Sequence, residues 1–369
     1  MKKFSLFLSF YLLFFFLFFA GAQLAVPHSK SRLELLHADV SRGMLQNNTL
    51  QRILEGNVHA RQDSLELFCD RATYYEQQKK FVLTGTVRIV RGQDTLRANT
   101  VNYFEVSKVA IAEKQVYVNR PGQSLRCDYL EYYYKTDQAR ASGNVLVHDT
   151  EKRVFLSGEY GEYLPSQKMS YVEKKSHLWQ LDSAATDTMH IYSRRMEYYF
   201  GDSRRAIAMD SVHIYQGALH ATCDSAVYYL DDEVALLEKK PHAIQENNEI
   251  FGDVMRLKMH NFELQQIVVK GHAQAVSVED SLLEKENKLE GREIIMYISN
   301  RKLQELWSIS NARSFYYLKE GETDKGINAA SADTIKAFFV RSELDSILVI
   351  GGAQGIYYPS DYKGPIRQE

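Results

Sequence analysis

The chain reads CDRATYY at residues 69–75, ANTVNYF at residues 98–104 and CDYLEYY at residues 127–133. Each stretch has a small residue, then a polar residue that we call the anchor, then an apolar residue two positions later, and finally a pair of aromatic residues. The anchors, which follow one another at intervals of 29 residues, are Asp70, Asn99 and Asp128. A fixed period of this size is typical of a repeat architecture, in which each copy packs against its neighbours.

The same pattern continues more faintly toward the C-terminus. Further anchors, at wider spacings, are Glu159, Arg194, Asp224, Asp253, Arg292 and Asp333. The apolar residues two positions after an anchor are Ala72, Val101, Leu130, Met196, Ala226, Met255, Ile294 and Ile335, and only Gly161 interrupts the series. This constancy indicates one buried face that runs through all the copies.

Hydrophobicity alternates within each copy as it does in β-strands. Val87 and Ile89 share one face, a turn follows at residues 92–94, and Leu96 and Ala98 share a face on the returning strand. After Ala98 the apolar phase slips by one residue, which predicts a β-bulge or a sharp bend at the anchor. Turn signals recur about every 15 residues, so we predict an all-β, elongated chain of antiparallel hairpins with about 20 strands, each about 8 to 10 residues long.

A sheet whose strands all bend at one level forms a V-shaped trough with apolar side chains on its inner face. The residues that we predict to line this trough are Leu65, Leu67, Ala72, Tyr74, Val87, Ile89, Leu96, Ala98, Val101, Tyr103, Leu125, Leu130, Tyr132, Met196, Tyr198, Ala226 and Tyr228. Inward apolar residues are needed to fold any β-sandwich. The residues alone therefore leave open whether the trough is a dry core or a groove for a long apolar ligand.

The first residues predict export. Two lysines precede an unbroken apolar run at residues 4–19, and Ala20-Gly21-Ala22 has the small-x-small pattern of a signal-peptidase site. We therefore predict a cleaved signal peptide at residues 1–22. The alternative is an inner-membrane anchor formed by residues 4–19, although this run is shorter than the ~20 apolar residues that a spanning helix needs.

Beyond the signal peptide we expect a lead-in at residues 23–33, a continuous β region at residues 34–358 and a C-terminal tail at residues 359–369. Length alone leaves open whether the β region is one long module or two fused modules. Two stretches within it, 279–290 and 319–326, are charged and poorly periodic. We expect them to be longer loops.

Composition and motifs narrow the class of function. The 45 Lys and Arg residues nearly balance the 47 Asp and Glu residues, so the net charge of −2 does not favour a nucleic-acid partner. The sequence contains no CxxC, HExxH, GxSxG or phosphate-binding GxxxxGK[ST] motif, and its 11 histidines are scattered. We therefore predict that the protein is not an enzyme and has no catalytic residue, metal site or cofactor.

The three cysteines share one position in the repeat. Cys69, Cys127 and Cys223 each precede an anchor, where other copies carry residues such as Ala98 or Gly158. This position selects small size, and a free cysteine packs as a small hydrophobic residue. A disulfide between Cys69 and Cys127 would have to cross the intervening copy, well beyond the ~7 Å limit on Cα separation. We therefore expect three buried free thiols.

These features resemble the OstA/LptA family of lipopolysaccharide-transport proteins. The resemblance is carried by the signal peptide, by Gly56-Asn57-Val58, Gly85-Thr86-Val87 and Gly143-Asn144-Val145, and by the hairpins that lead into each anchor. It extends from about Glu34 to Tyr358. The motifs are individually weak, and their order and repetition make the resemblance specific.

The resemblance implies a bent antiparallel β-jellyroll, the "β-taco", in the periplasm. It implies a bridge that carries lipopolysaccharide, held by its lipid A acyl chains, from the inner to the outer membrane during outer-membrane biogenesis. It also implies edge-to-edge contact with inner-membrane and outer-membrane transport components, and head-to-tail self-association as a further option.

Two other classes of function stay open from the residues. The first is a structural or adhesive envelope β-solenoid without a lipid cargo. The second is a polysaccharide-active enzyme with a right-handed parallel β-helix, although the coils of that fold are usually shorter than 29 residues. Such an enzyme would also need clustered carboxylates, whereas an anchor acid in most copies favours a role at a corner.

Overall fold

The computed structural model describes residues 34–46, 49–151, 153–181, 188–260, 263–280, 285–300, 302–320, 323–341 and 343–366. Its strands are β1 (Glu34–His37), β2 (Val40–Gln46), β3 (Thr49–Gln62), β4 (Leu65–Tyr75), β5 (Lys80–Arg91), β6 (Asp94–Phe104), β7 (Val109–Arg120), β8 (Gln123–Tyr133), β9 (Gln138–Asp149), β10 (Val154–Leu164), β11 (Met169–Leu181), β12 (Thr188–Tyr199), β13 (Arg205–Gln216), β14 (Leu219–Tyr229), β15 (Val234–Glu238), β16 (His242–Gln245), β17 (Asn248–Phe251), β18 (Val254–His260), β19 (Glu263–Asp280), β20 (Lys285–Ser299), β21 (Lys302–Glu320), β22 (Thr323–Val340), β23 (Glu343–Ile350) and β24 (Gln354–Tyr358). The described residues contain no α-helix, and one 3₁₀ turn (Pro165–Gln167) joins β10 to β11.

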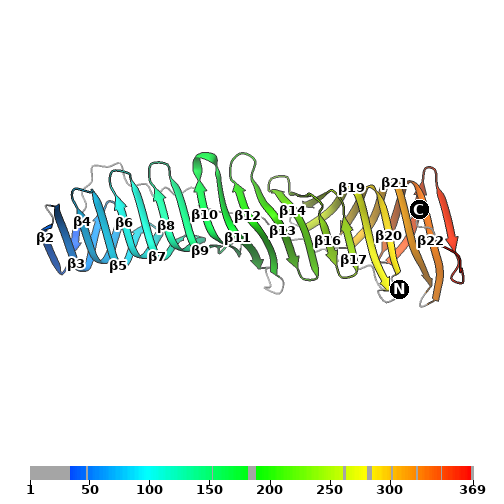
Figure 1. Ribbon diagram of the computed structural model, residues 1–369, viewed down its shortest axis with the longest axis horizontal. Coiled ribbons are helices and arrows are strands. Elements are labelled where there is room, and N and C mark those ends of the chain that lie inside the picture. Colours follow the sequence, from blue (N-terminus) through cyan, green and yellow to red (C-terminus); the bar gives the residue numbers. More distant parts are fainter. Residues whose placement is uncertain are drawn as a thin grey trace. The chain divides into compact units, whose positions relative to one another are not determined.

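The described residues divide into two compact units. The N-terminal unit contains residues 34–181 and Arg194–Arg204, and the C-terminal unit contains residues 188–193 and 205–366. Within each unit consecutive strands lie side by side, as Figure 1 shows, except where strands are interrupted, as in the pairing of β15 with β18. The paired strands run antiparallel. The all-β antiparallel fold predicted from the alternating pattern is confirmed.

The number of strands agrees with the predicted 20 when the two parts of each interrupted strand are counted as one. Four of the bent strands are interrupted at the bend, and both parts then pair with the same neighbour. These pairs are β1 and β2 on β3, β15 and β16 on β14, β17 and β18 on β19, and β23 and β24 on β22. Counting each pair once turns the 24 strands into 20 bent strands. The expected length was too short, because most strands continue through the bend and reach 11 to 13 residues.

Strands occupy the described parts of the two predicted long loops, so the loop prediction was wrong there. Strands β19 to β22 run through most of residues 279–290 and 319–326. Their charged side chains pair across strands: Nζ of Lys285 lies 2.7 Å from Oδ2 of Asp324. The backbone N–H of Tyr317 donates to Oδ1 of Asn287 at 2.8 Å. Low hydrophobicity here reflects polar cross-strand partners, which single-strand periodicity does not reveal.

Each bend is built from a bulge in the strand next to the anchor. Glu55 pairs with Arg71 and Val58 pairs with Cys69, so two residues of β3 lie opposite the single anchor Asp70. Residues with a positive φ occupy these bulges and the breaks between β15 and β16 and between β23 and β24. They are Gly56 and Asn57, Gly85, Lys114 and Gln115, Gly143 and Asn144, Lys174 and Lys175, Asp210 and Ser211, Lys239 and Lys240, Gly271 and His272, Ser310 and Asn311, and Gly351 and Gly352. An extra residue of this kind bends and twists a strand.

The anchor side chains hold the next bulge along the chain. Oδ2 of Asp70 accepts a hydrogen bond from the backbone N–H of Thr86 at 3.0 Å. Oδ2 of Asp128 accepts from Nδ2 of Asn144 at 2.7 Å, and Lys175 donates to Glu159 at 2.8 Å. Asp70 therefore satisfies a backbone donor of the bulge, whereas Asp128 and Glu159 bind side chains that the bulge presents. The expected corner role of the anchors is confirmed at these positions.

The three cysteines are unpaired and buried next to the anchors. Burial raises the pKa of Cys69 to about 11 and the pKa values of Cys127 and Cys223 to about 12. Since a thiolate is the reactive form, these thiols should be inert in the folded protein.

We expect no thiol of the folded protein to react with Ellman's reagent at pH 8 within minutes, and three thiols per chain to react after unfolding in guanidinium. The unfolded pKa is about 8.5, below the folded values, so the contribution of the neutral thiols to stability is intact below that pH and is lost as the pH rises toward the folded pKa. Rapid reaction of one thiol in the folded protein would contradict burial at that position.

No helix among the described residues is long and apolar enough to cross a bilayer. The predicted signal peptide at residues 1–22, the alternative anchor at residues 4–19 and the lead-in at residues 23–33 lie outside the described residues. The predicted division into a β region and a C-terminal tail stays a prediction.

Candidate functional site

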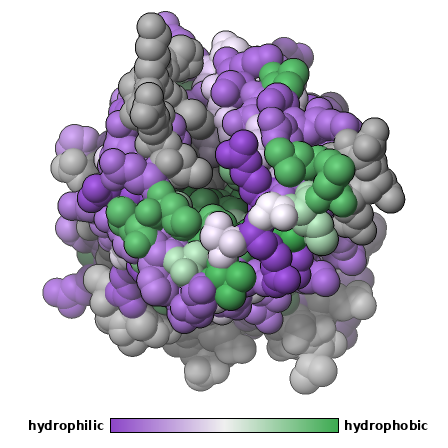
Figure 2. All heavy atoms as spheres, turned by 90° about the vertical axis from the view of Figure 1, so that its left-hand side faces the viewer, coloured by the Kyte–Doolittle hydropathy of each residue, from purple (hydrophilic) through white to green (hydrophobic). Residues whose placement is uncertain are grey.

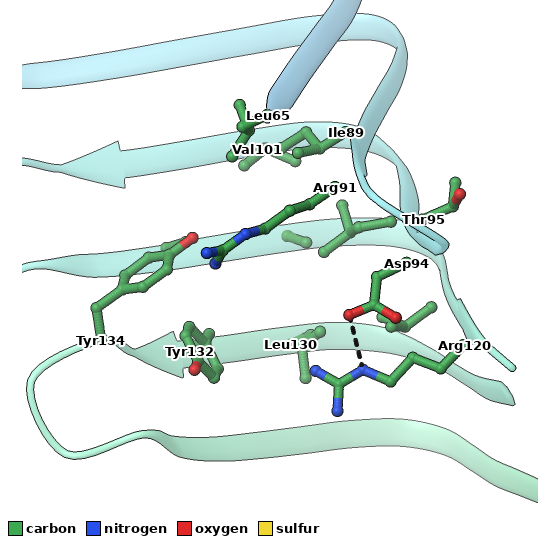
Figure 3. Close-up of a pocket in the computed structure, with 14 residues that line it drawn as sticks. Leu65, Ile89, Arg91, Asp94, Thr95, Val101, Arg120, Leu130, Tyr132 and Tyr134 are labelled. Atoms are coloured by element: carbon green, nitrogen blue, oxygen red, sulfur yellow. Dashed lines mark ion pairs between the residues drawn. The ribbon is translucent and has the colours of Figure 1, made fainter. Parts of the chain in front are cut away.

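The two halves of the bent strands face each other across an apolar interior in the N-terminal unit. A small cavity lies between them, and Figure 3 shows its lining. The lining residues are Leu65, Ile89, Arg91, Asp94, Thr95, Leu96, Val101, Ala110, Ala112, Val118, Arg120, Leu130, Tyr132 and Tyr134. Leu65, Ile89, Leu96 and Val118 lie on one side of the bend, whereas Val101 and Leu130 lie on the other. The bend therefore creates two walls from one set of strands.

Six of the predicted lining residues meet in this cavity, and they are Leu65, Ile89, Leu96, Val101, Leu130 and Tyr132. Other predicted residues of the N-terminal unit, Ala72, Val87, Ala98, Leu125, Met196 and Tyr198, are buried without lining it. Leu67, Tyr74 and Tyr103 are half-buried. Ala226 and Tyr228 are buried in the C-terminal unit, so the structure does not bring them to this cavity.

Three apolar residues of the cavity are missing from the predicted set. Ala110, Ala112 and Val118 lie on β7, which pairs with β6 through Tyr103, Val101 and Leu96. The run Val109-Ala110-Ile111-Ala112 is apolar on both faces, so alternation alone does not show which side points inward. Hairpin register from the repeat, with Val101 opposite Ala112, would have identified all three.

Polar groups form one margin of the cavity near the hairpin turns. Nε of Arg120 lies 3.5 Å from Oδ2 of Asp94, and Arg91 points toward Tyr134 in Figure 3. Burial and, to a lesser extent, nearby Tyr103 raise the pKa of Tyr134 to about 12, although Arg91 acts in the opposite direction. Two guanidinium groups therefore stand where the apolar interior meets the turns, which is where the polar end of an amphipathic ligand would lie.

The tyrosine pair Tyr132 and Tyr133 divides between the interior and the outer face. Tyr132 is buried and lines the cavity. Tyr133 donates instead to Glu131 on the outer face, where Nε of Arg140 also lies 2.7 Å from Oε1 of Glu162. Nε of Arg195 likewise lies 2.7 Å from Oε1 of Glu197. Tyr133 and Tyr199, the outer rings of their pairs, thus belong to polar networks that include Glu131 and Glu197.

The C-terminal unit has its own apolar interior. A second cavity there is lined by residues of β19 to β23 that include Ala275, Leu289, Leu306, Ile335 and Phe339. Ile335 belongs to the apolar series that follows the anchors. Both this cavity and that of the N-terminal unit have a volume of about 60 Å³. Each is far smaller than a fatty-acyl chain, so such a chain would enter only if the walls separate or the side chains rotate.

The N-terminal unit ends in a strand edge that no described strand covers. Strands β1 and β2 pair with β3 alone. Exposed hydrophobic residues gather on these strands, and they are Leu35, Leu36, Val40, Met44, Leu45 and Leu50. Figure 2 shows a hollow at this end with hydrophobic residues on both sides of it. An exposed edge with apolar side chains is a template for pairing with another strand.

The C-terminal unit has a comparable edge. Strands β23 and β24 pair with β22 alone among the described strands. Its exposed hydrophobic residues are Ile347, Leu348, Ile350, Ile356 and Tyr357. The edge is therefore also apolar and available for strand addition.

The described residues offer no cluster of three or more His, Cys, Asp or Glu residues that could hold a metal ion. Two histidines stack on aromatic rings: the ring centroids of His59 and Phe68 lie 4.3 Å apart, and those of His148 and Phe155 lie 4.0 Å apart. The strand pairing also overturns one alternative, because a right-handed β-helix is built from parallel strands whereas the strands here pair antiparallel.

The geometry defines a class of protein: a bent antiparallel sheet with an apolar interior and apolar free edges. Residues 30–188 match the model of a family described as OstA-like protein. The resemblance to the OstA/LptA family is thereby confirmed over this segment, which contains the whole cavity of the N-terminal unit.

The other comparisons concern curated proteins and solved structures. No curated protein matches the chain. Seventeen chains of solved structures match it. One is LptH from Pseudomonas aeruginosa, described as the LptA homologous periplasmic component of the conserved lipopolysaccharide transport device. It is 17% identical, the match covers 41% of this chain and 90% of that chain, and the TM-score is 0.28.

Proposed function

We propose that the protein is a periplasmic, lipid-binding bridge that carries lipopolysaccharide from the inner to the outer membrane along its apolar interior. The lipid A acyl chains bind between the two walls of the bent sheet. The protein acts without catalysis, and the energy for transfer comes from other parts of the transport machinery.

The apolar interior of the N-terminal unit carries this proposal. It is lined from both walls by residues such as Val101, Leu130 and Ile89, and it lies within the segment that matches the OstA-like family. Arg91 and Arg120 stand at its polar margin, where they could meet the phosphate groups of a lipid headgroup. An interior with an apolar body and a cationic margin suits an anionic amphiphile.

The free edges support the bridge part of the proposal. A strand from an inner-membrane or outer-membrane component, or from a second copy of this chain, would add to β1 and β2 or to β23 and β24 through backbone hydrogen bonds. Each addition would bury exposed hydrophobic side chains of that edge. We propose that export by the signal peptide at residues 1–22 brings the chain to the periplasm.

One observation favours the second candidate, a structural envelope protein without lipid cargo. The interior cavities measure about 60 Å³, so the walls are closed on each other. In a purely structural protein the apolar face would serve only to form this packed core. The two candidates therefore differ in whether the walls separate to admit a lipid.

Photocrosslinking in cells distinguishes a lipid-transport protein from a structural protein without lipid cargo. A benzophenone side chain at Val101 or Leu130 should form adducts with lipopolysaccharide, because both residues line the cavity. Asn102 is the matched control, since it follows Val101 on β6 and points to the opposite face of the sheet. Half-buried Ile89 serves as a third interior position if a bulky side chain at 101 or 130 prevents folding.

Adducts at interior positions and none at Asn102 would support a lipid conduit. Folded, exported protein without lipid adducts at any interior position would overturn the transport proposal and favour the structural one. Equal labelling at Val101 and Asn102 would also overturn it, because lipid would then contact the protein without using the interior.

A further inference from the structure

A row of basic and aromatic side chains crosses the outer face of the N-terminal unit. Cross-strand pairing links Phe68 to Arg88, Arg88 to Arg97, Arg97 to Tyr117, and Tyr117 to Arg126. Each of these residues neighbours a buried residue on its own strand, as Arg97 neighbours Ala98. The row therefore lies on the face opposite the apolar interior.

The pairing of Arg88 with Arg97 is unfavourable for folding. Like charges directly opposite each other on an antiparallel pair are destabilising. Arg88, Arg97 and Arg126 form no ion pair with any residue in the described ranges, although several other arginines of this unit do. Three guanidinium groups along one row thus lack a direct counter-charge within the described part of the chain.

Two of these guanidinium groups lie over aromatic rings. The guanidinium carbon of Arg88 lies 3.9 Å from the centroid of Phe68, and that of Arg126 lies 5.5 Å from the centroid of Tyr117. Stacking on a ring restricts a guanidinium while leaving the N–H groups at its edge free to donate. This arrangement pre-orients donors for an oxyanion.

The row lines an open groove of about 1400 Å³. Thr86, Asn99, Gln115 and Asn144 add polar groups to its lining, and Asp70 and Asp128 add two carboxylates. These carboxylates accept hydrogen bonds from Thr86 and Asn144 at the corners, so they are engaged in the bends. We call this surface the arginine groove.

We propose that the arginine groove is a binding site for a phosphorylated ligand. Arg88 and Arg97, on adjacent strands about 5 Å apart, would share one phosphate group, and Arg126, two strands farther along, would meet a second. The ligand is either a free phosphorylated solute or the headgroup of an anionic lipid. The site is separate from the interior, and the inference does not depend on the proposed transport function.

Calorimetric titration of the full chain at low ionic strength tests the site. Fructose 1,6-bisphosphate serves as a soluble probe with two phosphate groups, and vesicles of phosphatidylglycerol, compared with phosphatidylcholine, present a lipid headgroup. Arg97→Gln and Arg126→Gln should each weaken the affinity for the probe by at least about tenfold. Arg52→Gln is the matched control, because Arg52 is an exposed arginine of the same unit that does not line the groove.

A second measurement reports on the repulsion itself. Without ligand, Arg97→Gln should raise Tm by about 1–3 °C, because it removes the like-charge pair.

The binding experiment distinguishes the two sources of phosphate. Binding of the soluble probe that the arginine substitutions weaken supports a free ligand. Binding to phosphatidylglycerol vesicles alone, weakened by the same substitutions, supports a lipid headgroup. No saturable binding of either probe, or equal weakening by Arg52→Gln, would overturn the site.

Discussion

Replacing Gly85 with alanine should destabilise the protein by about 3 kcal/mol. Gly85 has a φ of +88°, a conformation that L side chains rarely adopt. A Cβ at this position would also overlap the carboxylate of Asp70, which holds the bulge by accepting from the backbone N–H of Thr86. The substitution therefore combines backbone strain with the loss of a corner hydrogen bond, and chemical denaturation would measure the change.

Gly92 provides the matched control for this effect. It also has a positive φ, of +58°, but a Cβ there meets no atom within 4 Å. Gly92→Ala should therefore cost only about 1 kcal/mol, from backbone strain. In the double variant Asp70→Ala with Gly85→Ala the steric part should disappear, so the two substitutions should be less than additive. Equal costs for Gly85→Ala and Gly92→Ala would contradict the corner role of Asp70.

Val101→Asp should destabilise the protein by about 4 kcal/mol or more, or prevent folding. Val101 is 3% exposed and lines the interior cavity between the walls. A carboxylate there would be buried mainly among apolar residues, such as Leu96, Ala112 and Leu130. The midpoint of urea unfolding, or the yield of soluble protein if the variant does not fold, measures the effect.

Asn102→Asp is the matched control, because it adds the same carboxylate one residue farther along β6 on the outer face. A surface change of this kind is expected to stay within about 0.5 kcal/mol. Val101→Thr, which keeps the shape of valine, gives a milder version of the interior change in case Val101→Asp does not fold. If Val101→Asp and Asn102→Asp have equal effects, the assignment of the inner face is wrong.

Short-range pattern predicted most of the bent-strand architecture. The phase slip after Ala98 located the bend, and the small residues before the anchors indicated buried corner positions, since both signals come from residues adjacent in the chain. The same reasoning failed at residues 279–290 and 319–326, because charged residues there pair across strands in β19 to β22. Local hydrophobicity contains no information about such partners.

The candidate site was predicted less completely. Leu96, Val101 and Leu130 were identified as inward-facing because they alternate with polar neighbours. Ala110 and Ala112 were missed because the run at residues 109–112 is apolar on both faces. The arginine groove was missed as well, since Arg88, Arg97 and Arg126 are isolated in the sequence and come together only through strand register.

The order of residues along the chain determines where each strand bends and which of its faces is buried. Positive φ at glycine, alternation at a period of two and a small residue before each anchor are all local properties. Tertiary structure alone decided how closely the two walls approach and which outer side chains become neighbours. Those outcomes depend on contacts between residues of different strands. Examples are the pairing of Arg88 with Arg97 and the approach of Leu96 and Leu130 across the cavity. No single stretch of the chain contains the strand register or the packing that brings such residues together.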